Sequence, residues 1–456
     1  MPVQETIVEA TEYRLVLVLP ESRKILAIGD VDWYRLPSIS IPQWTRPAEQ
    51  LREAIHTAWK LSVLILDFFH GSPICAVAEV LVPSQSTDLK AVSFERLQTP
   101  ELSEHQVTQI ASILAGDSQV SSPFARVGWI EEATKWLEAE TGRKLSSKCD
   151  IEQYNAGGGF ALVRFHMEDN RDYWLKATGD PNAHELSITT FLSKLCGRYL
   201  PELISSKPEW NAWLMSGEAT CVTEIPTAPS QLFTLLEDAV ECMAKLQIKT
   251  QGHNLDLISA GAFDQSIEVF RKHSEALFDY FGEAMDLQTS TKVPRLTRTR
   301  LQEMRTIFDD VCSYMEDLDL PETIVHGDIN RGNILIGCGH CQFIDWAEAY
   351  VGNPLICLQH LLLLNKVEDP GLQTFSNRAL RDKYRTIWLE SCDADALDQG
   401  FAYMPLIAVV STLYGRGDWL TSERRNDPQR QSYTRSLTRH MDRIAREPEL
   451  LGAPCH

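Results

Sequence analysis

HGDINRGNIL, at residues 326–335, is followed by FIDW at residues 343–346. The first stretch is typical of a loop that carries Asp328 and Asn333 and runs into a strand, and the second ends a strand at Asp345. Because a hairpin returns the chain to the edge that it left, we expect these three side chains to meet at one edge of a small sheet. Carboxylate and amide oxygens are ligands that Mg²⁺ prefers. The pattern therefore predicts a divalent-cation site beside a further carboxylate.

The two stretches resemble the catalytic loop and metal-binding segment of the aminoglycoside phosphotransferase and choline kinase family, which is related to protein kinases. The resemblance implies that Asp328 is the catalytic base or orients the substrate hydroxyl, that Asn333 and Asp345 bind Mg²⁺, and that His326 supports the loop. Protein kinases carry Asp-Phe-Gly where Asp345 is followed here by Trp and Ala, which favours a small substrate. The alternative is an Asn- and Asp-rich turn that only caps helices and ends strands. Four spaced matches within about twenty residues argue against that alternative.

A lysine and a glutamate upstream stand in the order that the family uses to hold nucleotide phosphates. Lys176 ends a predicted strand, and Glu185 begins a predicted helix. By the resemblance, Lys176 contacts the α- and β-phosphates of ATP, and Glu185 holds its ammonium group in place. The alternatives are a solvated lysine at a strand end and an acidic residue favoured by the helix dipole.

Three consecutive glycines, Gly157, Gly158 and Gly159, separate two predicted strands at 151–154 and 161–167. They depart from the glycine pattern of kinases, but backbone N–H groups in such a turn can approach phosphates because no side chain stands in the way.

The stretch WLMSG at residues 213–217 resembles the hinge between the two lobes of this family. The resemblance implies that the backbone from Met215 to Gly217 contacts the adenine of ATP. A departure from the family lies at Asn353, where Gly-Asp-Pro is more usual, and it bears on the geometry of that loop only.

The order of the predicted elements indicates an α+β protein with a protein-kinase-like two-lobed fold. We predict a small β-rich N-lobe with the hinge at residues 119–217 and a large helical C-lobe with the catalytic loop at residues 218–456. A small α+β accessory domain precedes them at residues 1–118. Its predicted strands lie at residues 13–19, 24–29, 63–69 and 74–82, and its predicted helices at residues 48–61 and 104–114.

The accessory domain resembles a degenerate Nudix hydrolase domain in its strand-strand-loop-helix order and in the sequence Arg-Glu-Ala at residues 52–54. The metal site of that family needs further glutamates one turn later, where His56 and Thr57 stand here, so the resemblance implies that hydrolysis is lost. A generic α+β accessory domain is the alternative, and binding of a protein partner through this domain stays open.

Composition excludes several classes of protein. The 456 residues include 43 Lys and Arg and 63 Asp and Glu, a formal net charge of −20, which argues against a nucleic-acid-binding surface. The N-terminus lacks a secretory signal, and apolar runs such as residues 15–19 fall short of the roughly 20 residues that cross a bilayer. We therefore expect a cytoplasmic protein without a membrane partner.

Eleven cysteines along the chain favour buried thiols in a reducing compartment. The sequence Cys-Gly-His-Cys at residues 338–341 resembles a redox motif, but it lies between two short predicted strands rather than at a helix start. We predict a hairpin turn there, with Cys338 and Cys341 in a redox or zinc site as the alternatives.

These patterns together predict an ATP- and Mg²⁺-dependent phosphotransferase that moves the γ-phosphoryl group to a hydroxyl of a small molecule. The helices between residues 232 and 315 are expected to select that molecule, which the sequence does not name. The alternatives are a catalytically silent nucleotide-binding or scaffold protein and a kinase or nucleotide transferase that acts on proteins. The complete set of site residues argues against the first. The short distance from Asp345 to Pro354 leaves little room for an activation segment and argues against the second.

Overall fold

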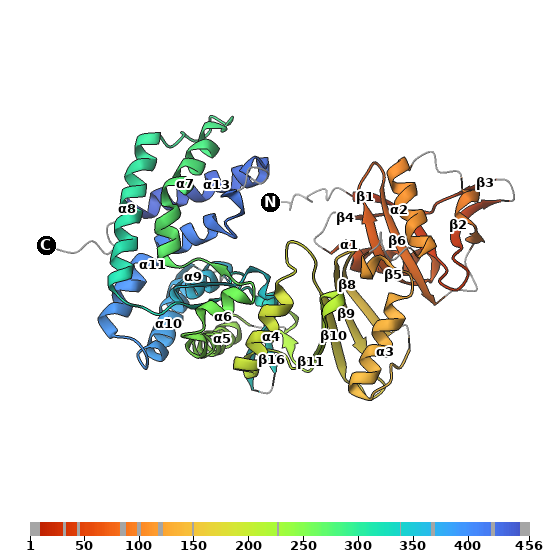
Figure 1. Cartoon of the computed structure of the whole chain (residues 1–456), viewed down its shortest axis with the longest axis horizontal. Helices are drawn as coiled ribbons and strands as arrows, with labels where there is room; N and C mark the ends of the chain where they lie inside the picture. The colour runs from red at the N-terminus through yellow and green to blue at the C-terminus, as the bar shows by residue number, and fades with distance from the viewer. Residues whose placement is uncertain are drawn as a thin grey trace. The chain divides into compact units, whose positions relative to one another are not determined.

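The computed structural model describes eleven stretches of the chain, which are residues 10–30, 33–42, 46–82, 88–97, 102–116, 122–147, 150–225, 228–337, 339–365, 370–420 and 425–446. The chain forms two compact units, Met1–Leu186 with Glu202–Glu218 and Ser187–Pro201 with Ala219–His456. The predicted α+β class is confirmed, with sheets in the first unit and mainly helices in the second (Figure 1). The domain boundaries predicted at residues 118 and 217 stay predictions, and residues 117–121 lie outside the described stretches.

The first unit begins with a mixed sheet in the order β3-β2-β1-β6-β5, in which β4 also pairs with β1 and β7 with β2. Its strands are β1 Ala10–Val18, β2 Ile25–Asp30, β3 Trp33–Arg35, β4 Ser38–Pro42, β5 Ser62–Phe69, β6 Ile74–Val82 and β7 Lys90–Val92. The accompanying helices are α1 Pro47–Trp59 and α2 Glu104–Ala115. The four strands and two helices predicted here are confirmed within a few residues. Strands β3, β4 and β7 were missed because they are short and lack a clear alternation.

A second, antiparallel sheet of the same unit has the order β11-β12-β10-β9-β8. Its strands are β8 Ile151–Gly157, β9 Phe160–His166, β10 Asp172–Ala177, β11 Leu203–Lys207 and β12 Ala212–Ser216. Burial alternates along β9 and β10, as expected when one face of a sheet packs on a core. The buried face shares its hydrophobic cluster with helix α3, Trp129–Thr141. Helix α4, Glu185–Cys196, begins at the end of this unit.

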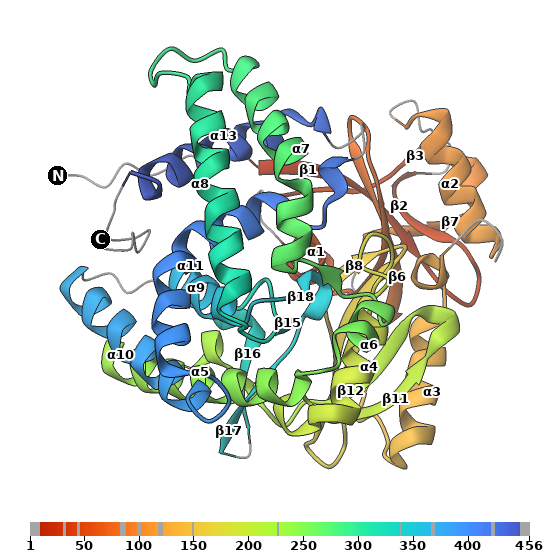
Figure 2. The ribbon, with the colours of Figure 1, turned by 60° about the vertical axis from the view of Figure 1, so that its left-hand side comes forward.

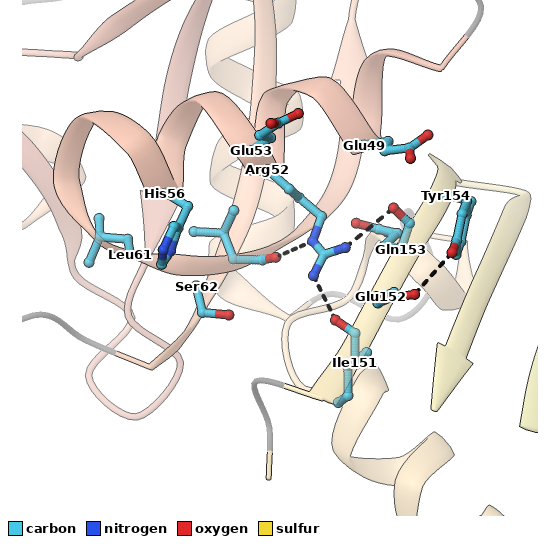
Figure 3. Close-up of a pocket in the computed structure, with 11 residues that line it drawn as sticks. Glu49, Arg52, Glu53, His56, Leu61, Ser62, Ile151, Glu152, Gln153 and Tyr154 are labelled. Carbon is cyan, nitrogen blue, oxygen red and sulfur yellow. Dashed lines mark hydrogen bonds between the residues drawn. The ribbon is translucent and has the colours of Figure 1, made fainter. Parts of the chain in front are cut away.

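Polar side chains join the two sheets of the first unit where their edge strands β5 and β8 meet. The side chain of Gln153, which is 1% exposed, pairs with the backbone of Ile65 by accepting from its N–H and donating to its carbonyl, both at 2.8 Å. Arg52 of α1 donates to the carbonyl oxygens of Val63 at 2.9 Å, Ile151 at 2.6 Å and Gln153 at 3.3 Å. Figure 3 shows this guanidinium group beside a pocket of about 400 Å³ between α1, β5 and β8. Several backbone groups at the facing edges of β5 and β8 are thereby hydrogen-bonded within the unit.

Replacing Arg52 by alanine should lower the free energy of unfolding by about 2 to 4 kcal/mol, because three backbone carbonyls lose a charged donor. Urea denaturation of the full-length protein measures this change. The control is Glu53→Gln, one position along the same helix on an exposed side chain, for which a change below about 0.5 kcal/mol is expected. Equal effects of the two substitutions would contradict a joining role of Arg52.

The second unit is built mainly of helices around one large hydrophobic cluster. The helices are α5 Pro229–Thr250, α6 Asn254–Ser259, α7 Ile267–Asp286, α8 Arg298–Asp317, α9 Leu355–Leu364, α10 Pro370–Trp388, α11 Ala394–Tyr414 and α13 Pro428–Ile444. Helices α7 and α8 lie side by side in both views (Figures 1 and 2). Two small sheets complete the unit, β13-β16-β17 and β14-β18-β15. Their strands are β13 Thr220–Cys221, β14 Phe263–Asp264, β15 Thr323–Val325, β16 Ile334–Gly337, β17 His340–Phe343 and β18 Tyr350–Gly352.

Helix α11 corrects the expectation that the apolar runs of this chain are all short. Among the described residues it is the one helix long and apolar enough, by length and composition alone, to cross a membrane. It is 67% buried over that apolar window and packs against α8, α9 and α13, so it is a core helix of the second unit. A cytoplasmic location stays a prediction.

Candidate active site

The loop from the end of β15 to the start of β16 brings Asp328 and Asn333 into contact. The side-chain amide of Asn333 donates from Nδ2 to the backbone carbonyl of Asp328 at 2.8 Å and to its Oδ2 at 3.2 Å. Asn333 is 8% exposed, whereas Asp328 is only half-buried. The loop is therefore cross-linked by a buried amide.

A second amide in the loop, Asn330, was missed by the sequence analysis. Its Nδ2 donates to Oδ1 of Asp328 at 2.9 Å, and its own Oδ1 accepts from the N–H of Gly332 at 2.7 Å. Both carboxylate oxygens of Asp328 thus receive an amide donor, one from Asn330 and one from Asn333. An asparagine two positions after the aspartate was the available signal. Its side chain could equally have bonded the local backbone, as asparagine does in turns.

The hairpin β16-β17 brings the residue before Asp345 into backbone contact with Asn333. Ile334 pairs with Phe343, and beyond this pair the N–H of Ile344 donates to the carbonyl of Asn333 at 3.1 Å. Asp345 follows at once with φ 67° and ψ 65°, a left-handed conformation that a non-glycine residue rarely adopts. Strained backbone of this kind persists where the surroundings hold it, often at functional sites.

His326 ties the loop to the segment that carries Asp345. It is fully buried, and its Nε2 lies 2.9 Å from the carbonyl oxygen of Ile344, which can only accept, so Nε2 carries the proton. Desolvation by burial lowers the pKa of the imidazole, which keeps it neutral. Its ring also packs against Trp346, with centroids 4.5 Å apart. These contacts are those of a supporting residue.

Two further residues fix the loop from the other side. Gly327 has φ 75°, and a β-carbon there would lie 2.2 Å from the carbonyl oxygen of Glu348, so only glycine fits. Asn365, at the end of α9, donates to the carbonyl of Ile329 at 2.9 Å. The departure at Asn353 leaves a local hydrogen bond before α9 in place, because its Oδ1 accepts from the N–H of Leu355 at 3.0 Å, as an aspartate oxygen would.

The donor set at this edge of the hairpin fits Mg²⁺. The Nδ2 atom of Asn333 is committed to Asp328, so its carbonyl oxygen Oδ1 is the atom left for a cation. Together with the carboxylate of Asp345 it offers only hard oxygen ligands, which suit Mg²⁺ with several waters. No group of three or more His, Cys, Asp and Glu that could hold a metal occurs in the part of the chain that the structure describes. Hard oxygen donors suit Mg²⁺ better than they suit a softer metal such as zinc.

In the first unit, Lys176 and Glu185 form the predicted pair. The Lys176 ammonium lies 2.5 Å from Oε1 of Glu185, with side-chain exposures of 16% and 1%. Lys176 also lies 5.7 Å from the centre of the Trp213 ring, a distance at which a cation is attracted to an aromatic face. A buried glutamate and a tryptophan thus fix the position of one ammonium group, which is unlike a solvated lysine at a strand end.

The glycine turn and the segment at the end of β12 both form contacts within the first unit. The N–H of Gly158 donates to Asp67 of β5 at 3.1 Å. A β-carbon on Gly159 would lie 3.3 Å from the Cα of Gly179, so the turn packs on the segment after β10. At the end of β12, the N–H of Gly217 donates to the carbonyl of Asp172 at 2.9 Å. Met215 lies between β10 and β11 and is 9% exposed.

The cysteine motif forms a hairpin turn between β16 and β17, as the sequence predicted. Cys338 lies outside the described residues. Cys341 lies on β17 with its side chain fully buried, and a contact with the Cys242 thiol, together with burial, raises the pKa of Cys341. A thiol of this kind is a poor nucleophile, so the structure does not favour a redox role for Cys341.

Part of the sequence that forms this site is similar to a known protein family. Residues 218–378 match the model of a family described as "Phosphotransferase enzyme family". These residues are similar to that family. The matched segment contains the loop, the hairpin and α9, so the predicted resemblance is confirmed there. The resemblance of residues 1–118 to Nudix domains stays a prediction.

Solved structures with some likeness to this chain include a choline/ethanolamine kinase family protein from Mesorhizobium loti. It is 15% identical, with a TM-score of 0.44 and coverage of 71% of this chain and 98% of that one. A macrolide 2'-phosphotransferase from Brachybacterium faecium is 14% identical, with a TM-score of 0.43 and coverage of 67% and 96%. A Plasmodium vivax ethanolamine kinase is 13% identical, with a TM-score of 0.42 and coverage of 76% and 95%. No curated protein matches the sequence. Likeness at this level decides nothing about activity.

Proposed function

We propose that this chain transfers the γ-phosphoryl group of ATP, with Mg²⁺, to a hydroxyl group of a small molecule. The observation that carries the proposal is the carboxylate of Asp328, held at both oxygens by the amides of Asn330 and Asn333, in a loop whose Asn333 backbone bonds the residue before Asp345. Phosphoryl transfer needs mainly positioning and charge stabilisation from the protein, and this arrangement supplies both.

Asp328 is the group that meets the acceptor. Because Asn330 and Asn333 fix its two oxygens, the half-buried carboxylate has a set direction and can accept a hydrogen bond from the substrate hydroxyl. As the oxygen of that hydroxyl bonds to the γ-phosphorus, the bond from phosphorus to the bridging oxygen of ADP breaks, and the hydroxyl proton passes to Asp328. Neutral His326 keeps the loop in register without taking part in proton transfer.

Lys176 and the ligand pair bind the nucleotide in this proposal. The ammonium group, fixed by Glu185, contacts the α- and β-phosphates, and the backbone from Met215 to Gly217 adjoins the adenine. Bound Mg²⁺ would neutralise charge on the phosphates, with Asn333 and Asp345 as its protein ligands.

A screen with γ-labelled ATP tests the proposal. The full-length protein is incubated with Mg²⁺ and fractions of a metabolite extract, and labelled products are separated from ATP and free phosphate. We expect one small-molecule product class with the native protein and none with the Asp345→Asn variant. Binding of ATP without label transfer to any fraction would contradict the proposal and favour a silent nucleotide-binding protein. Label found on protein would favour a protein-directed kinase.

A further inference from the structure

The glycine turn rests on a carboxylate that comes from the N-terminal sheet. Asp67 of β5 accepts from the N–H of Gly158, 91 residues later, through Oδ1 at 3.1 Å, and the same oxygen accepts from the N–H of Phe68 at 2.8 Å. A β-carbon built on Gly158 would lie 3.1 Å from Oδ2 of Asp67 and 2.7 Å from the hydroxyl oxygen of Ser122. The apex of the turn is therefore closely packed against polar atoms that lie outside its own hairpin.

The ionised carboxylate of Asp67 is energetically unfavourable at this position. Desolvation by burial raises the pKa of its carboxyl group, and the N–H groups of Phe68 and Gly158 offset only part of that effect. A buried carboxylate costs free energy unless donors compensate it, whereas an apolar residue would pack between sheets without that cost. The N–H group of Gly158, which donates to Asp67, is one of the backbone groups through which a glycine turn can bind an anion.

The turn and Lys176 lie at the same end of their sheet. Ala161 of β9 pairs with Ala177 of β10, directly after Lys176, and the backbone of Gly179 packs against Gly159. A triphosphate that contacts the Lys176 ammonium therefore reaches the end of the sheet where Asp67 holds the turn. Two anionic groups compete there for one N–H, and their like charges repel each other.

We propose that Asp67 is an internal competitor of the nucleotide, because its carboxylate holds the backbone N–H of Gly158 that a phosphate oxygen takes when ATP binds. This inference rests on the proposed function, since it requires the glycine turn to contact phosphates. Asp67 is then a positioning residue that sets nucleotide affinity through the turn, and the accessory region of the chain acts directly on the nucleotide site.

The variant Asp67→Asn tests the proposal in the full-length protein. Asparagine keeps the shape and an acceptor oxygen but removes the charge, so phosphate displaces it more easily. We expect the Kd for Mg-ATP, measured by isothermal titration, and the KM for ATP to fall about fivefold, while kcat stays within about twofold. A residue with only a structural role would instead raise both constants or leave them unchanged. Asp67→Ala, which removes charge and acceptor together, is a second variant and should also bind Mg-ATP more tightly.

Glu79→Gln is the matched control. Glu79 is a buried carboxylate of the neighbouring strand β6, and its Oε2 accepts from the N–H of Gly128 at 2.6 Å, away from the glycine turn. Its replacement should leave the Kd for Mg-ATP unchanged. Native protein that transfers phosphate from ATP, together with Asp67 variants of equal or weaker affinity, would overturn the inference alone. Absence of Mg-ATP binding in the native protein and in the variants would overturn it together with the proposed function.

Discussion

Replacing Asp328 by alanine should lower kcat about a thousandfold while the Kd for Mg-ATP changes by less than about threefold. A positioned proton acceptor contributes roughly 10² to 10⁴ in rate, and Asp328 is the carboxylate that the loop holds at both oxygens. The nucleotide keeps its proposed contacts, because Lys176 and the ligand pair are untouched. Initial rates with the acceptor from the screen, together with isothermal titration of Mg-ATP, measure the two effects separately.

Asn330→Ala is the matched control for this substitution. It removes one of the two amide donors to the carboxylate and leaves the carboxylate itself, so kcat should fall only about tenfold. Turnover by the Asp328→Ala variant at the native rate would refute the assignment of the proton acceptor. If kcat fell about a thousandfold in Asn330→Ala as well, the effect of Asp328→Ala could be explained by a disrupted loop instead of by the loss of the carboxylate.

Replacing Asp345 by asparagine should raise the Mg²⁺ concentration needed for half-maximal activity at least about tenfold and lower kcat about a thousandfold. The loss corresponds to about 4 kcal/mol of charge stabilisation in the transition state. Asparagine is the informative substitution because it adopts left-handed backbone readily, whereas alanine at φ 67° adds strain of about 1 to 2 kcal/mol. Rates measured across a Mg²⁺ titration give both quantities.

Asp319→Asn is the corresponding control. Asp319 also has a positive φ, 48°, and lies in the second unit outside the loop and the hairpin. Its replacement should leave the Mg²⁺ dependence unchanged. If Asp345→Asn shifted neither the Mg²⁺ dependence nor kcat, Asp345 would not be a metal ligand, and the proposed cation site would have to be abandoned.

The loop and hairpin could be predicted because the amide contacts on Asp328 and the pairing of β16 with β17 are local. Asp328, Asn333 and Asp345 lie within eighteen positions of one another, and strand pairing over four residues suffices to bring them together. Asn330 lies in the same stretch, yet an asparagine in a turn has several possible partners and its choice depends on atomic geometry. Local patterns thus gave the chemical groups of the site but not all of the hydrogen bonds that orient them.

The contacts between the sheets of the first unit could not be predicted, because their partners are far apart in the sequence. Gln153 pairs with Ile65 across 88 positions and Asp67 with Gly158 across 91. A polar residue in a strand, such as Gln153 or Asp67, is normally expected to face solvent. The alternation of apolar and polar residues indicates which face of a strand is buried, but it does not show what packs against the edge of the sheet. Arg52 was read as the remnant of a hydrolase motif, whereas in the folded chain it holds three carbonyl oxygens.

The junction made by Arg52 and Gln153 has a consequence for any attempt to shorten this protein. Strand β8 ends its sheet, and the groups that cover its outer edge come from residues that precede it by about a hundred positions. A fragment that begins after the first sheet would leave that edge bare, and a bare edge recruits strands from other molecules. We therefore expect the region that contains Arg52 and Ile65 to protect the edge of β8 from pairing with strands of other molecules.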